Sequence, residues 1–385
     1  MMRWMKRCGR QVALGALMLA GSATAEPLKI IAGPYMNYPT TTSMVVRWET
    51  NEPAASEAGV GISVDNLEWT AGAPEATYHE VKLEGLTPGS FYFYKVRSKG
   101  ADGALAESET LTFQTAIEGD TPFSFAVFGD TQANPEMVAK LAAHAYSQRP
   151  QFTLVAGDLV TDGLDKSHWL DHFFANMHPL NSRVPLIPCL GNHEEDSHFY
   201  YDYFSLPAPE YYYRIPYGNL EMFIVDSERP LVRGSEQYKW LDEALASSTA
   251  TWKIVCLHRP AFSSDADDFG DSTMVRATGG DIRMRFASEL YEKHGVDIVW
   301  CGHIHSYERT HPMNAGKPFI GKGVVYMITG GGGGDLEQAA PWRFSFAAKV
   351  YSGHHYTMVN IHGPKLRLDA YDIEGRIFDT YELTK

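Results

Sequence analysis

The segment Phe123–Gln132 reads FSFAVFGDTQ, an apolar run that turns polar at Gly129 and Asp130. Four later apolar runs also end in acidic, amide or imidazole side chains. Those endings are Gly157-Asp158-Leu159, Gly191-Asn192-His193-Glu194, His258, and Gly302-His303-Ile304-His305. In open α/β sheets, sites form just beyond the carboxyl ends of the strands. A glycine at such an end permits a tight turn and close approach of the backbone. The pattern predicts one polar site where these strands end.

The region around these runs, residues 122–385, alternates between short β-branched or aromatic runs and helical stretches. Helical periodicity is present in Glu136–Gln148, Ser235–Ala246 and Arg283–His294. Three closing runs indicate an antiparallel meander: Tyr356–Ile361, Leu366–Tyr371 and Arg376–Glu382. Alternating strands and helices imply an α/β (α+β) domain whose helices cover the faces of a sheet.

Residues 27–116 show a different pattern, in which apolar and polar residues alternate as in strands and no convincing helix is present. The run Phe91–Arg97 reads FYFYKVR, and turn signals such as Thr87-Pro88-Gly89 separate the runs. Short strands over this length predict a small all-β sandwich. The phrase GLTPGSFYFYKVRS resembles the turn and strand of a fibronectin type III domain. Residues 117–121 are then the linker to the second domain.

Length and composition narrow the class of protein. The chain has 385 residues, with 44% hydrophobic and 21% charged side chains, which favours two or three globular domains over disorder. The net charge of −14 argues against broad nucleic-acid binding and against attachment to an anionic membrane. Nothing in the sequence indicates the oligomeric state.

The N-terminus, residues 1–25, reads as a signal peptide. A basic stretch precedes the apolar run Val12–Ala20, and Ala23-Thr24-Ala25 fits a small-residue cleavage site. The apolar run is too short for a membrane span, so export without stable membrane insertion is favoured over an uncleaved anchor. Cys189, Cys256 and Cys301 each end an apolar run, which predicts buried free thiols.

The side chains at the strand ends are donors of one chemical type. They are Asp130, Asp158, Asn192, His258, His303 and His305, with Gln132 as a possible addition. Oxygen and imidazole donors without thiolate suit Zn, Mn, Fe or Mg. The set is too large for one tetrahedral ion, and a carboxylate shared between two metal ions would use it economically.

The order GD, GDL, GNHE, a lone histidine and GHIH resembles the calcineurin-like metallophosphoesterases, and GHIHSYER resembles their purple acid phosphatase-like branch. The resemblance extends to a fibronectin-like domain ahead of the catalytic one, and it implies a metallophosphoesterase-type β-sandwich flanked by helices. It also implies two metals, bridged by Asp158. Asp130 and His305 would bind the first metal, and Asn192, His258 and His303 the second. His193 would lie beside the substrate.

Two positions depart from the family pattern. Thr161 stands where purple acid phosphatases have a metal-binding tyrosine, and Gln132 stands where many relatives have histidine. Without a phenolate, ferric iron loses a preferred ligand, so the identity of the two divalent or mixed-valence ions stays open among Fe, Zn, Mn and Mg.

The function these residues predict is hydrolysis of small phosphate esters, acid phosphatase-like and directed to phosphomonoesters, by attack of a metal-bound hydroxide. His193 is the candidate to protonate the leaving group. Arg259 and Glu194 are candidates for substrate contact, although Glu194 could instead orient His193 or cap a helix. Two alternatives stay open: a phosphodiesterase with the same metal site, and an extracellular binding protein whose metal site is vestigial.

Overall fold

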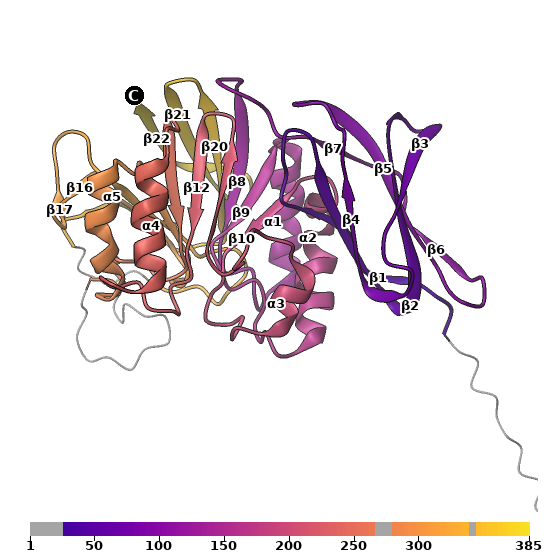
Figure 1. Cartoon of the computed structure of the whole chain (residues 1–385). Coiled ribbons are helices and arrows are strands. Elements are labelled where there is room, and N and C mark those ends of the chain that lie inside the picture. Colours follow the sequence, from indigo (N-terminus) through magenta and orange to yellow (C-terminus); the bar gives the residue numbers. More distant parts are fainter. Residues whose placement is uncertain (1–25, 266–278, 339–343) are drawn as a thin grey trace, which may run out of the picture.

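The computed structural model describes residues 26–265, 279–338 and 344–385. The predicted signal peptide lies outside the described residues. The part of the chain from residue 122 onward, called the larger part below, contains two β-sheets that face each other (Figure 1). The first contains β8 (Phe123–Phe128), β9 (Phe152–Val155), β10 (Leu186–Pro188), β20 (His355–His362), β21 (Lys365–Asp372) and β22 (Ile377–Thr384). The second runs in the order β11 (Tyr213–Tyr217), β12 (Leu220–Ile224), β13 (Trp252–Cys256), β14 (Ile298–Cys301), β18 (Val325–Thr329), β15 (Tyr307–Thr310), β19 (Ala347–Tyr351).

Parallel pairing brings the polar strand ends to one side of the molecule. β8, β9 and β10 are parallel neighbours in the first sheet, and β12, β13, β14 and β18 are parallel neighbours in the second. The closing strands β20, β21 and β22 form the predicted antiparallel meander, which joins the first sheet through β8. A short hairpin of β16 (Met313–Asn314) and β17 (Lys317–Pro318) stands apart.

Helices cover the outer face of each sheet, so the predicted β-sandwich flanked by helices is confirmed (Figure 1). The first sheet is covered by the helices α1 (Pro135–Ser147) and α2 (Ala175–Asn181) and the π-helix η1 (His168–Phe174). The second is covered by α4 (Glu236–Ser247), α5 (Ser288–His294) and the 3-10 helix η2 (Met284–Ala287). α3 (His198–Tyr203) follows the turn that carries His193. The helix predicted over Arg283–His294 is thus divided into a 3-10 turn and an α-helix.

Burial on both faces explains why the strands read as continuous apolar runs. In β8, Phe125 and Val127 point into the core between the sheets, whereas Ala126 and Phe128 pack toward the helices of the first layer. The cysteines behave as predicted, because Cys189, Cys256 and Cys301 are buried and unbridged. Within the described residues, no helix is long and apolar enough to cross a membrane.

The N-terminal part is a β-sandwich, as predicted (Figure 1). Its strands are β1 (Ile30–Asn37), β2 (Met44–Ser63), β3 (Asn66–Ala71), β4 (Ala76–Leu83), β5 (Phe91–Lys99), β6 (Leu105–Glu107) and β7 (Leu111–Gln114). The first half of β2 pairs with β1 and β4, and its second half pairs with β3 and β5. A strand that passes from one sheet to the other in this way forms a corner of the sandwich. Trp48, Tyr94 and Phe113 fill its core.

The junction between the two parts was not evident from the sequence. β1 pairs in parallel with β10 at Asn37 and Leu186, so one sheet continues from the N-terminal sandwich into the larger part of the chain. Beside this pair, the Tyr35 hydroxyl donates to the carbonyl oxygen of Tyr203 at 2.7 Å, and the Tyr35 ring stacks on Phe174 with centroids 4.5 Å apart. The two parts therefore share main-chain hydrogen bonds as well as side-chain packing.

Candidate metal centre

The site lies where the carboxyl ends of five strands from both sheets meet. Asp130, Asp158 and Asn192 follow β8, β9 and β10 of the first sheet, while His258 and His303 follow β13 and β14 of the second. Most of these groups are buried, so their polar atoms must find partners within the protein or bind a ligand.

Backbone strain accompanies three of these residues. Asp130, Asp158 and His303 have φ angles of 57°, 52° and 71°, a left-handed conformation that is uncommon outside glycine. Such conformations concentrate at functional sites. Two glycines make the close packing possible: a Cβ atom at Gly191 would lie 2.2 Å from Asp158 Oδ1, and one at Gly302 would lie 2.3 Å from Asp130 Oδ2.

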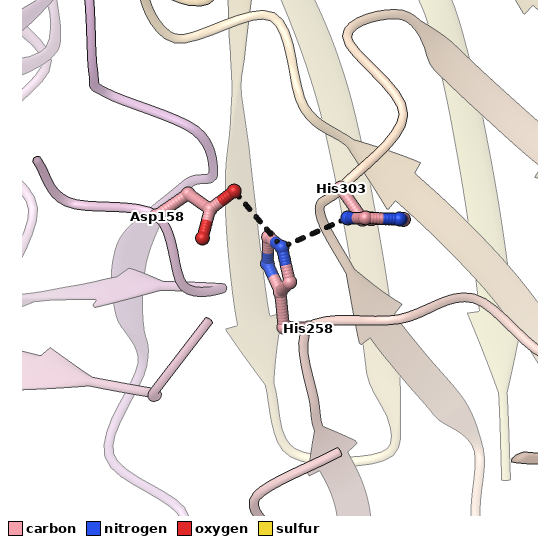
Figure 2. A group of neighbouring side chains, drawn as sticks. All are labelled: Asp158, His258 and His303. Carbon is pink, nitrogen blue, oxygen red and sulfur yellow. Dashed lines mark hydrogen bonds and ion pairs between the residues drawn. The ribbon is translucent and has the colours of Figure 1, made fainter. Parts of the chain in front are cut away.

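One group of donors consists of Asp158, His258, His303 and Asn192. Ligand atoms of the first three lie within 4.8 Å of one another, and Figure 2 shows them converging. His258 Nε2 is 3.1 Å from Asp158 Oδ2, 3.2 Å from His303 Nδ1 and 3.1 Å from Asn192 Oδ1. On the far side of the ring, His258 Nδ1 donates to the carbonyl oxygen of Ala156, which directs Nε2 toward the group.

The second group consists of Asp130, His305 and Gln132. His305 Nε2 lies 3.5 Å from Asp130 Oδ1 and 3.1 Å from the Gln132 amide nitrogen. His305 Nδ1 donates to the carbonyl oxygen of Asp335, so the ring is oriented as that of His258 is. Gln132 Nε2 is also 3.4 Å from Asp158 Oδ2. The same Asp158 oxygen thus faces both groups.

The electrostatics of this metal-free cluster favour cations. Burial alone would raise the pKa of Asp158, but His258 outweighs it and holds that pKa well below its usual range. Burial opposes charge on His258, yet the neighbouring Asp158 and Asp130 raise its pKa to about 10. Burial likewise opposes charge on His305, while Asp130 raises its pKa to about 9. These rings hold protons for which a metal ion would compete, since metal binding displaces protons from its ligands.

His193 lies at the open side of the cluster. Its Nδ1 donates to the carbonyl oxygen of Thr161 at 2.6 Å, which leaves Nε2 facing the site 4.0 Å from Asp158 Oδ2. The side chain is 37% exposed, in contrast to the buried candidates Asp158 and His258. The backbone N–H of His193 donates to Asp158 Oδ1, so the two residues are held in register.

Glu194 requires a correction. The sequence suggested contact with substrate, but its side chain is fully buried. Its two oxygens accept hydrogen bonds from the backbone N–H groups of Gly191, Leu159 and Asp158 at 2.6, 2.7 and 2.9 Å. Burial and the negative charge of Asp158 raise the pKa of Glu194, whereas the backbone N–H groups of Gly191 and Leu159 oppose that rise and favour the carboxylate. Glu194 therefore holds together the two turns that carry Asp158 and Asn192, and it neither binds His193 nor caps a helix.

Arg259 lies at the edge of the site. Its Nε donates to Glu228 at 2.6 Å, and its Nη1 lies 2.8 Å from His303 Nε2. The ion pair with Glu228 holds the guanidinium beside the group of donors that contains His303. Contact with substrate stays a prediction for this residue.

Comparison with known proteins agrees with this architecture. Residues 123–307 match the calcineurin-like phosphoesterase family, and residues 33–115 match the N-terminal domain of purple acid phosphatases. The chain belongs to the calcineurin-like phosphoesterase family, in its purple acid phosphatase-like branch. Human acid phosphatase type 7 is 27% identical to it, over 95% of this chain and 92% of that protein.

Two further relatives of this metallophosphoesterase bear on fold and activity. A purple acid phosphatase from yellow lupin seeds superposes with a TM-score of 0.81 at 20% identity, covering 91% of this chain and 74% of that one. A probable inactive purple acid phosphatase of Arabidopsis thaliana is 23% identical over 87% of this chain and 62% of its own length. The relatives of this chain therefore include proteins named as phosphatases and proteins named as probably inactive. The likeness of the N-terminal sandwich to fibronectin type III domains stays a prediction.

The family depends on two metal ions, and the residues of this metallophosphoesterase fit such a pair. Two groups of nitrogen and oxygen donors share one Asp158 oxygen, and buried Gln132 Oε1 accepts no hydrogen bond from any described residue. The hydroxyl of Thr161, which stands where the family has a phenolate, accepts a hydrogen bond from the backbone N–H of Ala133. The assignment of each ligand to one of the two metals stays a prediction.

Several backbone groups that orient the histidines of this site could not be identified from the sequence. The carbonyl oxygens of Ala156, Thr161 and Asp335 orient His258, His193 and His305. Every residue has a carbonyl oxygen, so only the folded backbone reveals which ones serve the site.

Proposed function

We propose that the protein is an exported dinuclear-metal phosphoesterase that hydrolyses phosphate esters, with phosphomonoesters as the preferred substrates. The observation that carries this proposal is the position of Asp158 Oδ2. It lies 3.1 Å from His258 in one donor group and 3.4 Å from Gln132 in the other, with His193 Nε2 4.0 Å away. Asp130, Asp158, Asn192, His258, His303, His305 and Gln132 would hold the metals.

When bound, two cations would neutralise the charge of the phosphate group and lower the pKa of bound water. The protein's own contribution is positioning. Glu194 holds the turns of Asp158 and Asn192 at fixed separation through backbone N–H groups, and the Ala156 and Asp335 carbonyl oxygens aim two ligand rings. Positioning of this kind lowers the reorganisation needed during the reaction.

His193 would transfer a proton to the leaving-group oxygen. Its Nδ1 is committed to the Thr161 carbonyl oxygen, so Nε2 is the nitrogen that can hold and donate a proton toward the substrate. Arg259, beside His303, offers a guanidinium to phosphate oxygens. Bulk acidity at −14 argues against a large polyanionic partner such as nucleic acid, but a small phosphate ester meets a locally cationic site once metals are bound.

Export rests on the predicted signal peptide of residues 1–25, which lie outside the described residues. Two other functions are distinguishable by experiment. A phosphodiesterase would use the same donors, and a binding protein with a vestigial metal site stays an alternative because two relatives are named as probably inactive.

The test is a metal and activity analysis of the full mature chain. Protein stripped of metal is reloaded with Mn²⁺, Zn²⁺, Fe²⁺ or Mg²⁺, its metal content is measured, and turnover of p-nitrophenyl phosphate is compared with that of bis(p-nitrophenyl) phosphate. We expect two ions per chain and faster hydrolysis of the monoester, with both lost in Asp158→Ala. Equal or faster turnover of the diester would refute the monoester preference. Two bound ions without turnover of either ester would favour the vestigial site.

A further inference from the structure

A buried carboxylate of the N-terminal sandwich reaches into the larger part of the chain. Glu49, in β2, is only 1% exposed. One of its oxygens pairs with the ammonium group of Lys166, and the other accepts a hydrogen bond from the Tyr203 hydroxyl at 2.8 Å. The Lys166 ammonium also lies 5.1 Å from the ring centroid of Tyr78 in the sandwich. Glu49 therefore connects two segments of the larger part at a single buried point.

Both segments lead to His193. Lys166 ends the segment that begins at Asp158 and includes Thr161, whose carbonyl oxygen orients His193. Tyr203 is the last residue of α3, the helix that follows the His193 turn. Glu49 thus holds the chain on both sides of the proposed proton donor, although it belongs to a different sandwich.

The segment between Asp158 and Lys166 packs tightly against the turn that carries His193 and Glu194. The backbone N–H of Gly163 donates to the His193 carbonyl oxygen at 2.8 Å, and a Cβ atom at Gly163 would lie 2.1 Å from the Glu194 carbonyl oxygen. The Trp169 indole N–H donates to the Gly163 carbonyl oxygen at 2.9 Å. With so little free space, a shift at Lys166 moves the Thr161 carbonyl oxygen and, with it, the His193 ring.

We propose that the N-terminal sandwich acts as a positioning element for the site, with Glu49 as the positioning residue that fixes His193 through Lys166 and Tyr203. The inference rests on the proposed function, in which His193 protonates the leaving group. A displacement of about 1 Å at such a group can cost about 100-fold in rate, so a modest loosening has a measurable effect.

The test uses Glu49→Gln and Lys166→Met in the full chain, because both substitutions keep side-chain volume while removing the charge pair. Steady-state kcat is measured on phenyl phosphate, whose leaving group needs a proton, and on p-nitrophenyl phosphate, whose leaving group does not. We expect two metals per chain in both variants and a fall of about tenfold in the phenyl to p-nitrophenyl rate ratio. Loss of stability alone leaves that ratio unchanged.

Two variants serve as controls for other contacts between the sandwich and the larger part. Glu109→Gln applies the same substitution to the ion pair with Arg183, and Tyr94→Phe removes the hydrogen bond from a buried tyrosine to the Ser182 carbonyl oxygen. Neither contact leads to the segment that ends at Lys166, so both variants should keep the wild-type ratio. Controls that lower the ratio as much as Glu49→Gln would overturn the proposal, as would an unchanged ratio in both test variants.

Hydrogen exchange gives a readout that does not depend on activity. Peptides covering residues 158–167 should exchange faster in Glu49→Gln than in wild type, whereas peptides covering β8 should not change, because the loosening is confined to one segment. If the wild-type protein hydrolyses neither ester but this difference appears, the proposed function fails and the positioning stands. If both esters are hydrolysed but exchange is unaltered, the positioning fails alone.

Discussion

Replacing Glu194 by glutamine should weaken metal binding, although the Glu194 side chain contacts the proposed ligand Asp158 through the Asp158 backbone N–H and not through the Asp158 carboxylate. Its carboxylate accepts backbone hydrogen bonds at 2.6, 2.7 and 2.9 Å from Gly191, Leu159 and Asp158. Glutamine has a single acceptor oxygen. If that oxygen keeps the hydrogen bond from the Leu159 N–H, the NH₂ group of glutamine faces the N–H groups of Asp158 and Gly191. Donor then faces donor, and the repulsion pushes the Asp158 turn away. Loss of such supporting contacts typically costs 10–100-fold in metal affinity, or about 1.4–2.7 kcal/mol.

The assay is a calorimetric titration of metal-free Glu194→Gln with Zn²⁺ or Mn²⁺, beside wild type and the control Glu195→Gln. Glu195 is exposed, so the same substitution one position later should leave both dissociation constants within about twofold of wild type. Circular dichroism establishes that each variant is folded. If Glu194→Gln binds both ions as tightly as wild type does, the backbone bonds are not what holds the ligands in place, and the reasoning is refuted.

Three other perturbations follow from the geometry. His193→Ala should keep both metals but lower kcat on phenyl phosphate about 100-fold or more, with a smaller loss on p-nitrophenyl phosphate; equal losses would contradict a proton-donor role. Gln132→Ala should weaken one of two calorimetric binding steps about tenfold and leave the other, because its amide lies 3.1 Å from His305; two unchanged steps would remove Gln132 from the ligand set. Burial lowers the pKa of His355 to about 4 in the folded protein. Between about pH 6.5 and pH 4, His355 is therefore protonated in the unfolded chain but neutral in the folded protein. Stability should therefore fall by about 3 kcal/mol as the pH drops from about 6.5 to 4, and denaturant unfolding should show a shallower fall in His355→Gln; identical pH profiles would contradict this.

The strand ends could be predicted because they combine two local signals. An apolar run such as Phe123–Phe128 must be buried, and a polar residue directly after it marks the point where the chain leaves the core. Parallel pairing of β8 with β9 then brings Asp130 and Asp158 to the same edge of the first sheet.

What could not be predicted depends on contacts between distant segments. The parallel pair of Asn37 with Leu186 joins positions far apart in the chain. Nothing in the local sequence of either strand indicates with which strand it pairs. The direction of Glu194 likewise depends on which N–H groups stand unpaired once two turns have packed together. A residue-type pattern identifies candidates for a site, but it does not tell which of them face inward to support it.

The continuous sheet also bears on how such a chain is made and kept soluble. β10 is three residues long and has β9 on one side and β1 on the other. The phosphoesterase half, produced without the sandwich, would leave β10 as an open edge, and unpaired edges invite pairing between molecules and aggregation. Because synthesis proceeds from the N-terminus, β1 emerges before β10 and can serve as the template on which β10 and its neighbours in the first sheet pair.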